Sequence, residues 1–234
     1  MTGRKLLLVH GAWHGAWCWQ PVIQRLRADG ISVVAVDLPF TSFEDDVEAI
    51  RQAAVGLGPE LVLCGHSYGG RLVSATARSL TTVGHLIYLS AQVPNERQFA
   101  EYVALRRATN TANTAIPDLE TLRTKYYNSC SEPDFRAAAL RLRPMVSVPG
   151  GTLGLDCRPW RTIRSTYIVC THDRAIDPAA QRLMAGNVTY TAEIPADHAA
   201  FFSAPGELSR VLSSVVRTGS PQPDDAGRRD ATGP

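Results

Sequence analysis

The chain has 234 residues, a length that fits one α/β domain. Hydrophobic residues make up 44% of it and charged residues 20%, so a sizeable core is possible and wholesale disorder is excluded. Lysine plus arginine (24) nearly balance aspartate plus glutamate (22), and no basic run suggests a nucleic-acid partner. The apolar run Leu6–Val9 is far shorter than the ~20 residues of a membrane span. No secretory signal pattern opens the chain, so we expect a cytoplasmic protein.

Short β-branched or leucine-rich runs alternate with helical patterns, which is typical of βαβ units and a mostly parallel sheet. The predicted strands are residues 5–10, 32–36, 60–64, 85–89, 166–170 and 188–194. The predicted helices are residues 20–29, 43–55, 68–80, 178–185 and 205–217. The expected fold class is therefore α/β, with a mostly parallel central sheet of about six strands and flanking helices.

Residues 94–160 break this alternation. Helical patterns at 96–107, 118–127 and 133–142 precede a stretch rich in proline and glycine. The segment is too long for a plain loop, so we expect a helical cap over the C-terminal edge of the sheet. The cap would be inserted into a domain spanning 1–217, whose core is 4–93 and 161–217. Residues 218–234 lack apolar side chains larger than alanine and are predicted to form a flexible tail.

The candidate nucleophile lies in a turn flanked by glycines. Residues 65–69 read Gly-His-Ser-Tyr-Gly, a G-x-S-x-G pattern that follows one predicted strand and opens the next predicted helix. This is the context that a nucleophile elbow needs. Side chains at Gly65 and Gly69 would collide with neighbouring backbone, and the helix N-terminus favours negative charge beside Ser67. The ordinary alternative is that Ser67 only caps the helix.

A serine is a weak nucleophile at neutral pH and needs a base and an orienting acid. In the elbow-type fold the acid follows a later strand and the histidine comes last. Asp173 lies three residues past the strand predicted at 166–170, and His198 lies four residues past the strand predicted at 188–194. Both therefore sit at C-terminal strand ends, where open α/β sheets build their sites. The order Ser67, Asp173, His198 predicts a catalytic triad.

Other residues compete for these roles. Asp177 is a rival acid, although its position before a proline suits a helix cap. His172 adjoins Asp173, but neighbouring residues at a strand end point in opposite directions. His85 opens a predicted strand and is expected to be structural, while His66 is expected to pack beside the nucleophile.

Stabilising the oxyanion of acyl transfer requires two backbone N–H donors. One is expected from Tyr68, after the nucleophile, and the other from Ala12, in the loop after the first strand. In that loop Gly11 would let the chain turn sharply, and Trp13 is the aromatic residue expected to face the pocket. The cap supplies further candidate lining: Tyr126, Tyr127, Phe135, Leu140 and Met145. The substrate-binding residues that we expect are Gly11, Trp13, Tyr126 and Tyr127.

Several of these segments resemble the plant methylesterase and hydroxynitrile lyase family of α/β-hydrolases. Residues 10–19 read His-Gly-Ala-Trp-His-Gly-Ala-Trp-Cys-Trp and look like the H-G-x-x-H-G-x-W-x-W opening of that family. Residues 167–176 resemble its strand and acid loop, and residues 196–198, Ala-Asp-His, resemble its base motif. The likeness is specific over 5–89 and 165–212 and weak across the cap.

The resemblance implies an α/β-hydrolase fold, a triad of Ser67, Asp173 and His198, and oxyanion donors at Ala12 and Tyr68. Lyase members carry threonine where this chain has Gly11 and lysine where it has Ala199. Without that hydroxyl and cation, cyanohydrin chemistry is not expected, so the resemblance favours the esterase branch. Between Leu38 and Gly65 the chain is also shorter than the family pattern, which alters one wall of the pocket.

The expected function is a serine hydrolase that cleaves a carboxylic ester of a small apolar or aromatic acid through an acyl-enzyme. One alternative is a cyclase, lactonising enzyme or lyase of specialised metabolism with the same triad, because fold does not fix function. A second is a non-enzymatic ligand sensor on a hydrolase scaffold. The five cysteines are too widely spaced for a zinc or redox motif, and no metal or organic cofactor is expected. The expected partner is a small-molecule substrate, not a nucleic acid or membrane, and a homodimer is compatible with the sequence.

Overall fold

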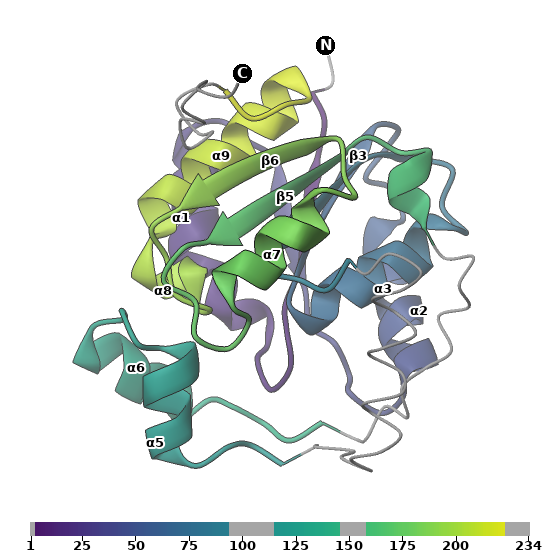
Figure 1. Ribbon diagram of the computed structural model, residues 1–234. Helices are drawn as coiled ribbons and strands as arrows, with labels where there is room; N and C mark the ends of the chain where they lie inside the picture. The colour runs from purple at the N-terminus through teal and green to yellow at the C-terminus, as the bar shows by residue number, and fades with distance from the viewer. Residues whose placement is uncertain (1–2, 94–114, 146–157, 223–234) are drawn as a thin grey trace, which may run out of the picture.

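The computed structural model describes residues 3–93, 115–145 and 158–222 and shows a layered α/β arrangement (Figure 1). In the described residues, six parallel strands form one sheet in the order β2-β1-β3-β4-β5-β6. The strands are β1 Leu6–Val9, β2 Val33–Val36, β3 Leu61–His66, β4 Val83–Leu89, β5 Ser165–Cys170 and β6 Tyr190–Ile194. The predicted parallel sheet of about six strands is confirmed.

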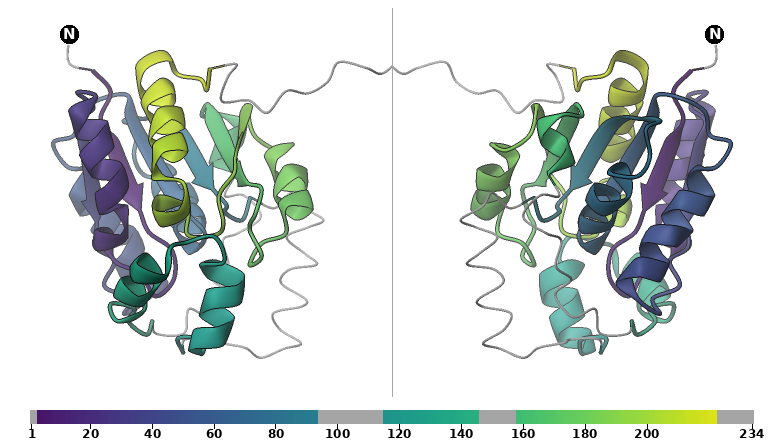
Figure 2. Two further views of the ribbon diagram at one scale, coloured as in Figure 1. Left: turned by 90° about the vertical axis from the view of Figure 1, so that its left-hand side faces the viewer. Right: turned by 90° about the vertical axis from the view of Figure 1, so that its right-hand side faces the viewer.

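Helices cover both faces of this sheet (Figure 2). One face carries α1 (Gln20–Ala28), α8 (Ala200–Ser203) and α9 (Pro205–Thr218), and the other carries α2 (Phe43–Ala54), α3 (Tyr68–Ala77) and α7 (Pro178–Ala185). Successive side chains of a strand point to opposite faces. Leu6 and Leu8 of β1 therefore join the core beneath α1 and α9, while Leu7 and Val9 join the core beneath α2 and α3. Burial on both sides explains why β1 is apolar throughout.

The described part of the cap lies beyond the C-terminal ends of the strands (Figure 1). It contains α5 (Leu119–Thr121), the π-helical turn η2 (Leu122–Tyr126) and α6 (Glu132–Ala139). The helical pattern at 118–127 is confirmed, but its second half is π-helical and not α-helical. The chain widens because the Tyr127 N–H donates to the Leu122 carbonyl, and the Tyr126 carbonyl accepts from the Ala199 N–H in the core. The helix predicted at 96–107 lies outside the described residues.

Smaller differences follow from local interactions. The 3₁₀ turns η1 (Ala16–Trp19) and η3 (Pro159–Arg161) and the short helix α8 were not predicted, because pieces of three or four residues carry no helical periodicity. Helix α9 ends at Gly219, whose φ of +82° suits a left-handed cap. Most of the predicted tail, residues 223–234, lies outside the described residues. No helix in the described ranges is long and apolar enough to cross a membrane.

Candidate active site

Ser67 occupies a strained turn between β3 and α3. Its φ of +50° and ψ of −115° are rare for a residue other than glycine, and such strain persists only where the surroundings enforce it. The Ser67 N–H donates to the Leu89 carbonyl of β4 over 3.1 Å. A Cβ on Gly69 would lie 2.7 Å from the carbonyl oxygen of His10, and one on Gly65 would strike the Gly69 backbone. The elbow thus requires both glycines for close approach, as the sequence indicated.

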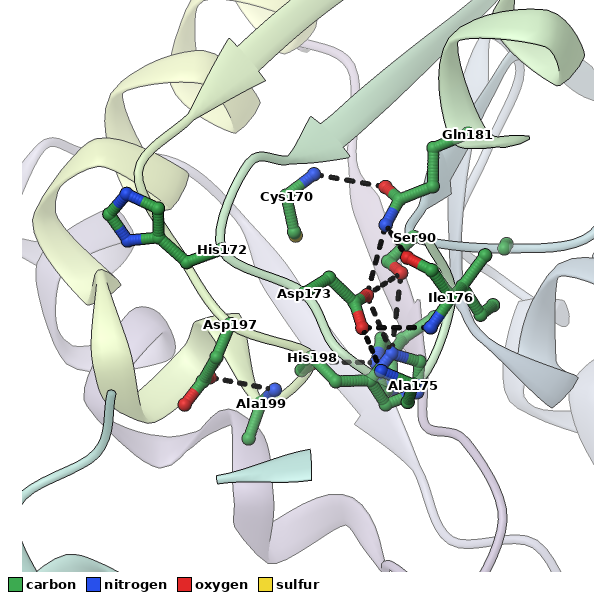
Figure 3. Close-up of polar contacts among 12 residues, drawn as sticks. Ser90, Cys170, His172, Asp173, Ala175, Ile176, Gln181, Asp197, His198 and Ala199 are labelled. Atoms are coloured by element: carbon green, nitrogen blue, oxygen red, sulfur yellow. Dashed lines mark hydrogen bonds and ion pairs between the residues drawn. The ribbon is translucent and has the colours of Figure 1, made fainter. Parts of the chain in front are cut away.

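Asp173 follows β5, and its carboxylate accepts hydrogen bonds on both oxygens (Figure 3). Oδ1 accepts from the backbone N–H groups of Ala175 (2.7 Å) and Ile176 (2.9 Å). Oδ2 accepts from His198 Nδ1 (2.8 Å), from Gln181 Nε2 (3.0 Å) and from the Ser90 hydroxyl. Burial alone would raise the pKa of Asp173, but the His198 charge and these hydrogen bonds lower it below its usual value. The carboxylate is therefore ionised at neutral pH.

His198 follows β6 and is 4% exposed. Because its Nδ1–H donates to Asp173, the neutral ring keeps a lone pair on Nε2. The backbone carbonyl of His198 accepts from His66 Nε2 over 2.9 Å, and the two rings lie 4.8 Å apart. Since His66 directly precedes Ser67, this bond ties the loop of the base to the elbow. Within the described residues no hydrogen bond joins Ser67 Oγ to His198, and such bonds often tighten only when substrate binds.

The rival residues lie elsewhere or serve structure. His172 is exposed, and its side chain points away from Asp173 (Figure 3). Asp177 caps α7 by accepting from the Ala179 N–H over 2.7 Å. His85 is buried, bonds to the Thr166 hydroxyl and stacks on another ring. Each of these placements agrees with the role favoured from the sequence.

The loop after β1 lies against the elbow. A Cβ on Gly11 would come within 2.8 Å of His66 Nδ1 and 3.1 Å of Ser67 Cβ, so this position has no room for a side chain. The sharp turn expected at Gly11 occurs instead at Trp13, whose φ is +64°. Glycine is therefore needed at position 11 for close approach, and not for a left-handed conformation.

Two buried histidines hold the peptide planes of this loop. His10 Nδ1–H donates to the Gly11 carbonyl (2.9 Å), and its Nε2 accepts from the backbone N–H of Leu38 (3.0 Å). In a trans peptide the N–H points opposite to the carbonyl, so this bond also fixes the direction of the Ala12 N–H. His14 Nδ1–H donates to the Ala12 carbonyl (2.8 Å). Burial lowers the pKa of His10 to about 4 and that of His14 to about 3, so both rings are neutral at pH 7.

Tyr68, the residue after Ser67, is held through its side chain. Its hydroxyl donates to Asp46 Oδ2 over 2.8 Å, and the same buried carboxylate accepts from the Phe40 N–H over 2.8 Å. Burial raises the pKa of Asp46. The phenol is thus engaged away from the reaction, which leaves the backbone N–H of Tyr68 as the group available at the start of α3.

The two neighbouring cap tyrosines differ in position. The Tyr126 ring packs edge-on to the rings of Trp13 and His198, with centroids 5.4 Å away in each case. Tyr127 is fully buried, and its hydroxyl donates to His14 Nε2 over 2.6 Å. Tyr126 and Trp13 thus lie beside His198, whereas Tyr127 supports the loop from behind and does not line the candidate site.

Of the other cap residues proposed as lining, Leu140 is 89% exposed and points to solvent, so that expectation is wrong. Phe135 is buried against the Tyr127 ring. Met145 packs partly buried against the core under α2 and α3. The cap therefore contributes fewer lining residues to the candidate site than the sequence suggested.

Four contributors were not identified from the sequence: Ser90 and Gln181 beside Asp173, Asp197 beside His198, and Arg143 in the cap. Ser90 directly follows β4, so the strand-end rule that found Asp173 could have found it. The described residues contain no group of three or more His, Cys, Asp or Glu side chains able to hold a metal ion.

Comparison with known proteins agrees with the α/β-hydrolase fold described above. Residues 6–211 match the model of the "Alpha/beta hydrolase family". Methyl jasmonate esterase 1 of Vitis vinifera is 30% identical, with 92% of this chain and 97% of the relative covered. Norfluorocurarine synthase 2 of a Strychnos species is 26% identical, with 91% and 95% covered. The crystal structure of the Arabidopsis methylesterase MES16 superimposes with a TM-score of 0.76 at 25% identity, covering 91% of this chain and 98% of that one.

Proposed function

Because the chain belongs to the alpha/beta hydrolase family, we propose that it is a serine hydrolase that acts on a carboxylic ester. The relatives named as methyl esterases support esterase activity. The observation that carries the proposal is the 2.8 Å hydrogen bond from His198 Nδ1 to a buried, ionised Asp173, beside a serine strained to a φ of +50°. A histidine held by an ionised aspartate is the base that a nucleophilic serine requires.

In the proposed reaction, His198 Nε2 takes the Ser67 proton as Oγ attacks the ester carbon. The resulting oxyanion accepts hydrogen bonds from the Ala12 and Tyr68 N–H groups. Collapse of the tetrahedral intermediate breaks the bond to the alcohol, which leaves with the proton held by His198. Water then attacks the acyl-enzyme, giving its proton to His198, and the acid leaves as Ser67 regains its proton. Asp173 stays ionised and stabilises the imidazolium in both steps.

The acid released is proposed to be small and apolar or aromatic. Support comes from the Trp13 and Tyr126 rings, which lie beside the base. The proposed partner is accordingly a small molecule, and a cytoplasmic site of action is part of the same proposal.

A panel of p-nitrophenyl and methyl esters tests the function, using wild type, Ser67→Ala and the surface control Ser79→Ala. Hydrolysis by wild type and Ser79→Ala, with a loss of several orders of magnitude in Ser67→Ala, is expected; a triad deletion in subtilisin costs on the order of 10⁶. A fluorophosphonate should label Ser67. Labelling of a different serine would overturn the assignment.

A second candidate is supported by the relative named norfluorocurarine synthase 2, since its name states a product that is formed and does not name an ester as the substrate. The same triad would then act in a cyclisation or elimination on a specialised metabolite. Mass spectrometry distinguishes the two, because an acyl-enzyme of Ser67 accumulates only in nucleophilic catalysis. A silent ester panel with Ser67 still labelled by fluorophosphonate would favour this second candidate.

A further inference from the structure

Ser90 is a buried serine whose hydroxyl contacts both Asp173 and His198. It is fully buried directly after β4, and its hydroxyl donates to Asp173 Oδ2, the same oxygen that accepts from His198 Nδ1. Ser90 Oγ also lies 3.3 Å from His198 Nδ1. The three side chains therefore form a closed triangle on the side of the base away from its free Nε2 (Figure 3).

The backbone at Ser90 is held in a strained conformation. Its φ is +39°, a region rarely occupied by residues other than glycine, and strain of this kind persists only where the surroundings enforce it. The Ser90 N–H extends the β4–β5 ladder by donating to the Ile168 carbonyl (3.0 Å). The Tyr167 hydroxyl donates to the Ala91 carbonyl (2.6 Å). Strand β5, which leads into Asp173, thus enforces the turn that directs the Ser90 hydroxyl at that carboxylate.

We propose that Ser90 is a positioning residue that shares Oδ2 of Asp173 with His198 and thereby makes His198 a weaker base. This inference rests on the proposed function, because it assigns Ser90 a part in tuning the same triad. A hydroxyl that donates to Oδ2 withdraws negative charge from the carboxylate that would stabilise the imidazolium. The second contact of the Ser90 hydroxyl, 3.3 Å from His198 Nδ1, is longer and weaker. The bond to Asp173 therefore decides whether Ser90 raises or lowers the basicity of His198.

The other groups around His198 do not reproduce this effect. His66 and His14 face it from β3 and the loop after β1, and burial keeps both rings neutral at pH 7. The Tyr126 phenol approaches from the cap, with a pKa raised first by burial and then by the Asp173 charge. Asp197, the neighbouring carboxylate, bonds to Ser129, Ser203 and Ala199. Of the described side chains around the base, Ser90 is the neutral donor that contacts both Asp173 and His198 Nδ1.

The test measures how fast a fluorophosphonate labels Ser67 as a function of pH, in wild type, Ser90→Ala and Ser90→Gly. Both variants lack the hydroxyl, but only the glycine also relieves the strained φ. We expect the acid limb of the labelling profile to move up by about half to one pH unit in both, since one unit corresponds to about 1.4 kcal/mol. The plateau at high pH should stay within about tenfold of wild type.

Two controls make the outcome specific. Ser209→Ala removes another buried serine hydroxyl, which bonds to the Pro205 carbonyl in α9, and should leave the limb unchanged. Gln181→Leu removes a donor to Oδ2 that does not touch His198, and should move the limb in the same direction by less.

An unmoved limb in Ser90→Ala and Ser90→Gly, with Ser67 still labelled, overturns the role of Ser90 and leaves the proposed function standing. Absence of labelling in wild type overturns the proposed function itself. NMR titration of the His198 ring then tests Ser90 separately, and equal midpoints in wild type and Ser90→Ala would overturn its role.

Discussion

Asp197 accepts a hydrogen bond from the backbone N–H of Ser129 over 2.7 Å, and this bond joins the cap to the loop that carries His198. The same buried carboxylate accepts from the Ala199 N–H (3.0 Å) and the Ser203 hydroxyl (2.7 Å). Asn128 adds a second link, since its side-chain amide donates to the His172 carbonyl in the acid loop. This part of the cap is therefore a fixed wall of the site.

Replacing Asp197 should weaken both the fold and the site. In Asp197→Ala the Ser129 N–H, the Ala199 N–H, the Ser203 hydroxyl and the Cys130 thiol lose their acceptor. The Ala199 and Cys130 donors are buried, and each buried unsatisfied group costs about 1–3 kcal/mol. We expect a loss of several kcal/mol in urea unfolding together with a fall in kcat. Asp134→Asn, in the exposed first turn of α6, is the matched control in the cap and should change either value little. Unaltered stability in Asp197→Ala would show that the cap does not depend on this carboxylate.

The proposed triad could be assembled from the sequence because each of its members lies within four residues of the end of a strand. That logic needs only strand order, which the apolar runs of β3, β5 and β6 reveal. The partners of Asp173 were harder to find. The Ser90 hydroxyl contacts Asp173 because β4 pairs with β5 and because the φ of Ser90 is positive. Neither the strand pairing nor the positive φ can be predicted from the local periodicity of the sequence.

The cap shows the opposite case. Helical periodicity cannot indicate that the chain widens into a π turn, and that turn decides which tyrosine faces the base. Tyr126 and Tyr127 are adjacent and chemically equal, so the sequence could not separate them. The tertiary bond from the Ala199 N–H to the Tyr126 carbonyl orients this turn.

Arg143 is expected to position the loop after β1. Its N–H donates to the Trp13 carbonyl (2.9 Å), its guanidinium donates to the Leu38 carbonyl and pairs with Asp37 (3.3 Å), and it lies 5.0 Å from the Phe40 ring. Arg143→Ala should lower kcat by about tenfold to a hundredfold, because small displacements of catalytic groups have such effects. Arg143→Lys should recover part of the rate.

Arg141 is the matched control for that experiment. It belongs to the same cap segment but packs over the Trp17 ring, 4.5 Å from its centroid. Arg141→Ala should keep kcat within about twofold of wild type, since surface changes away from buried networks are usually small. Equal effects of the two alanine variants on kcat would contradict a specific role for Arg143.

Gly11 is predicted to tolerate no side chain. Gly11→Ala places a Cβ 2.8 Å from His66 Nδ1 and 3.1 Å from Ser67 Cβ, so either the loop or the elbow must move. We expect kcat/KM to fall by at least about a hundredfold. In Gly206→Ala a Cβ would meet no atom within 4 Å, and helix α9 should gain slightly in stability. Near wild-type activity in Gly11→Ala would show that the loop adapts.

Cyanide release from mandelonitrile is predicted to stay at the uncatalysed rate in wild type. A cyanohydrin lyase needs a cation beside the base and a hydroxyl donor in the loop, and this chain has Ala199 and Gly11 there. Ala199 is 1% exposed, with its N–H directed at Asp197 and Tyr126, so no charge reaches the base from it. Robust cyanide release that Ser67→Ala abolishes would refute this reasoning.

The two acidic candidates should separate by mutation. Asp173→Asn changes the acceptor of His198 and the ring tautomer that it fixes, and an equivalent change in a serine protease lowers kcat by about 10⁴. Asp177→Asn should act on α7 alone, with at most about 1 kcal/mol lost because asparagine is also a good cap. Initial rates and urea unfolding of both variants test this. A reversed pattern would assign the acid to Asp177.

Four buried histidines should make the protein sensitive to acid. Burial lowers the pKa of His10 and His85 to about 4 and that of His14 to about 3, and it lowers the pKa of His66 well below its usual value. In the unfolded chain each would titrate near 6.5. The unfolded state therefore binds more protons below that pH, and stability is lost as the pH falls from about 6.5 toward the folded values. Burial raises the pKa of Asp46, so this carboxyl group favours the folded state as the pH falls. It offsets the effect of one proton, whereas the four histidines together account for four.

Each histidine then contributes a slope of at most about 1.4 kcal/mol per pH unit, so urea midpoints should drop steeply between about pH 6.5 and about pH 4. His85→Gln tests one site without touching the triad, because glutamine can still bond to the Thr166 hydroxyl but cannot titrate. Its slope should be shallower by about one proton, whereas His172→Gln, at an exposed position, should match wild type. A flat stability profile over this pH range would mean that the buried rings accept protons in the folded state, contrary to the burial that keeps them neutral.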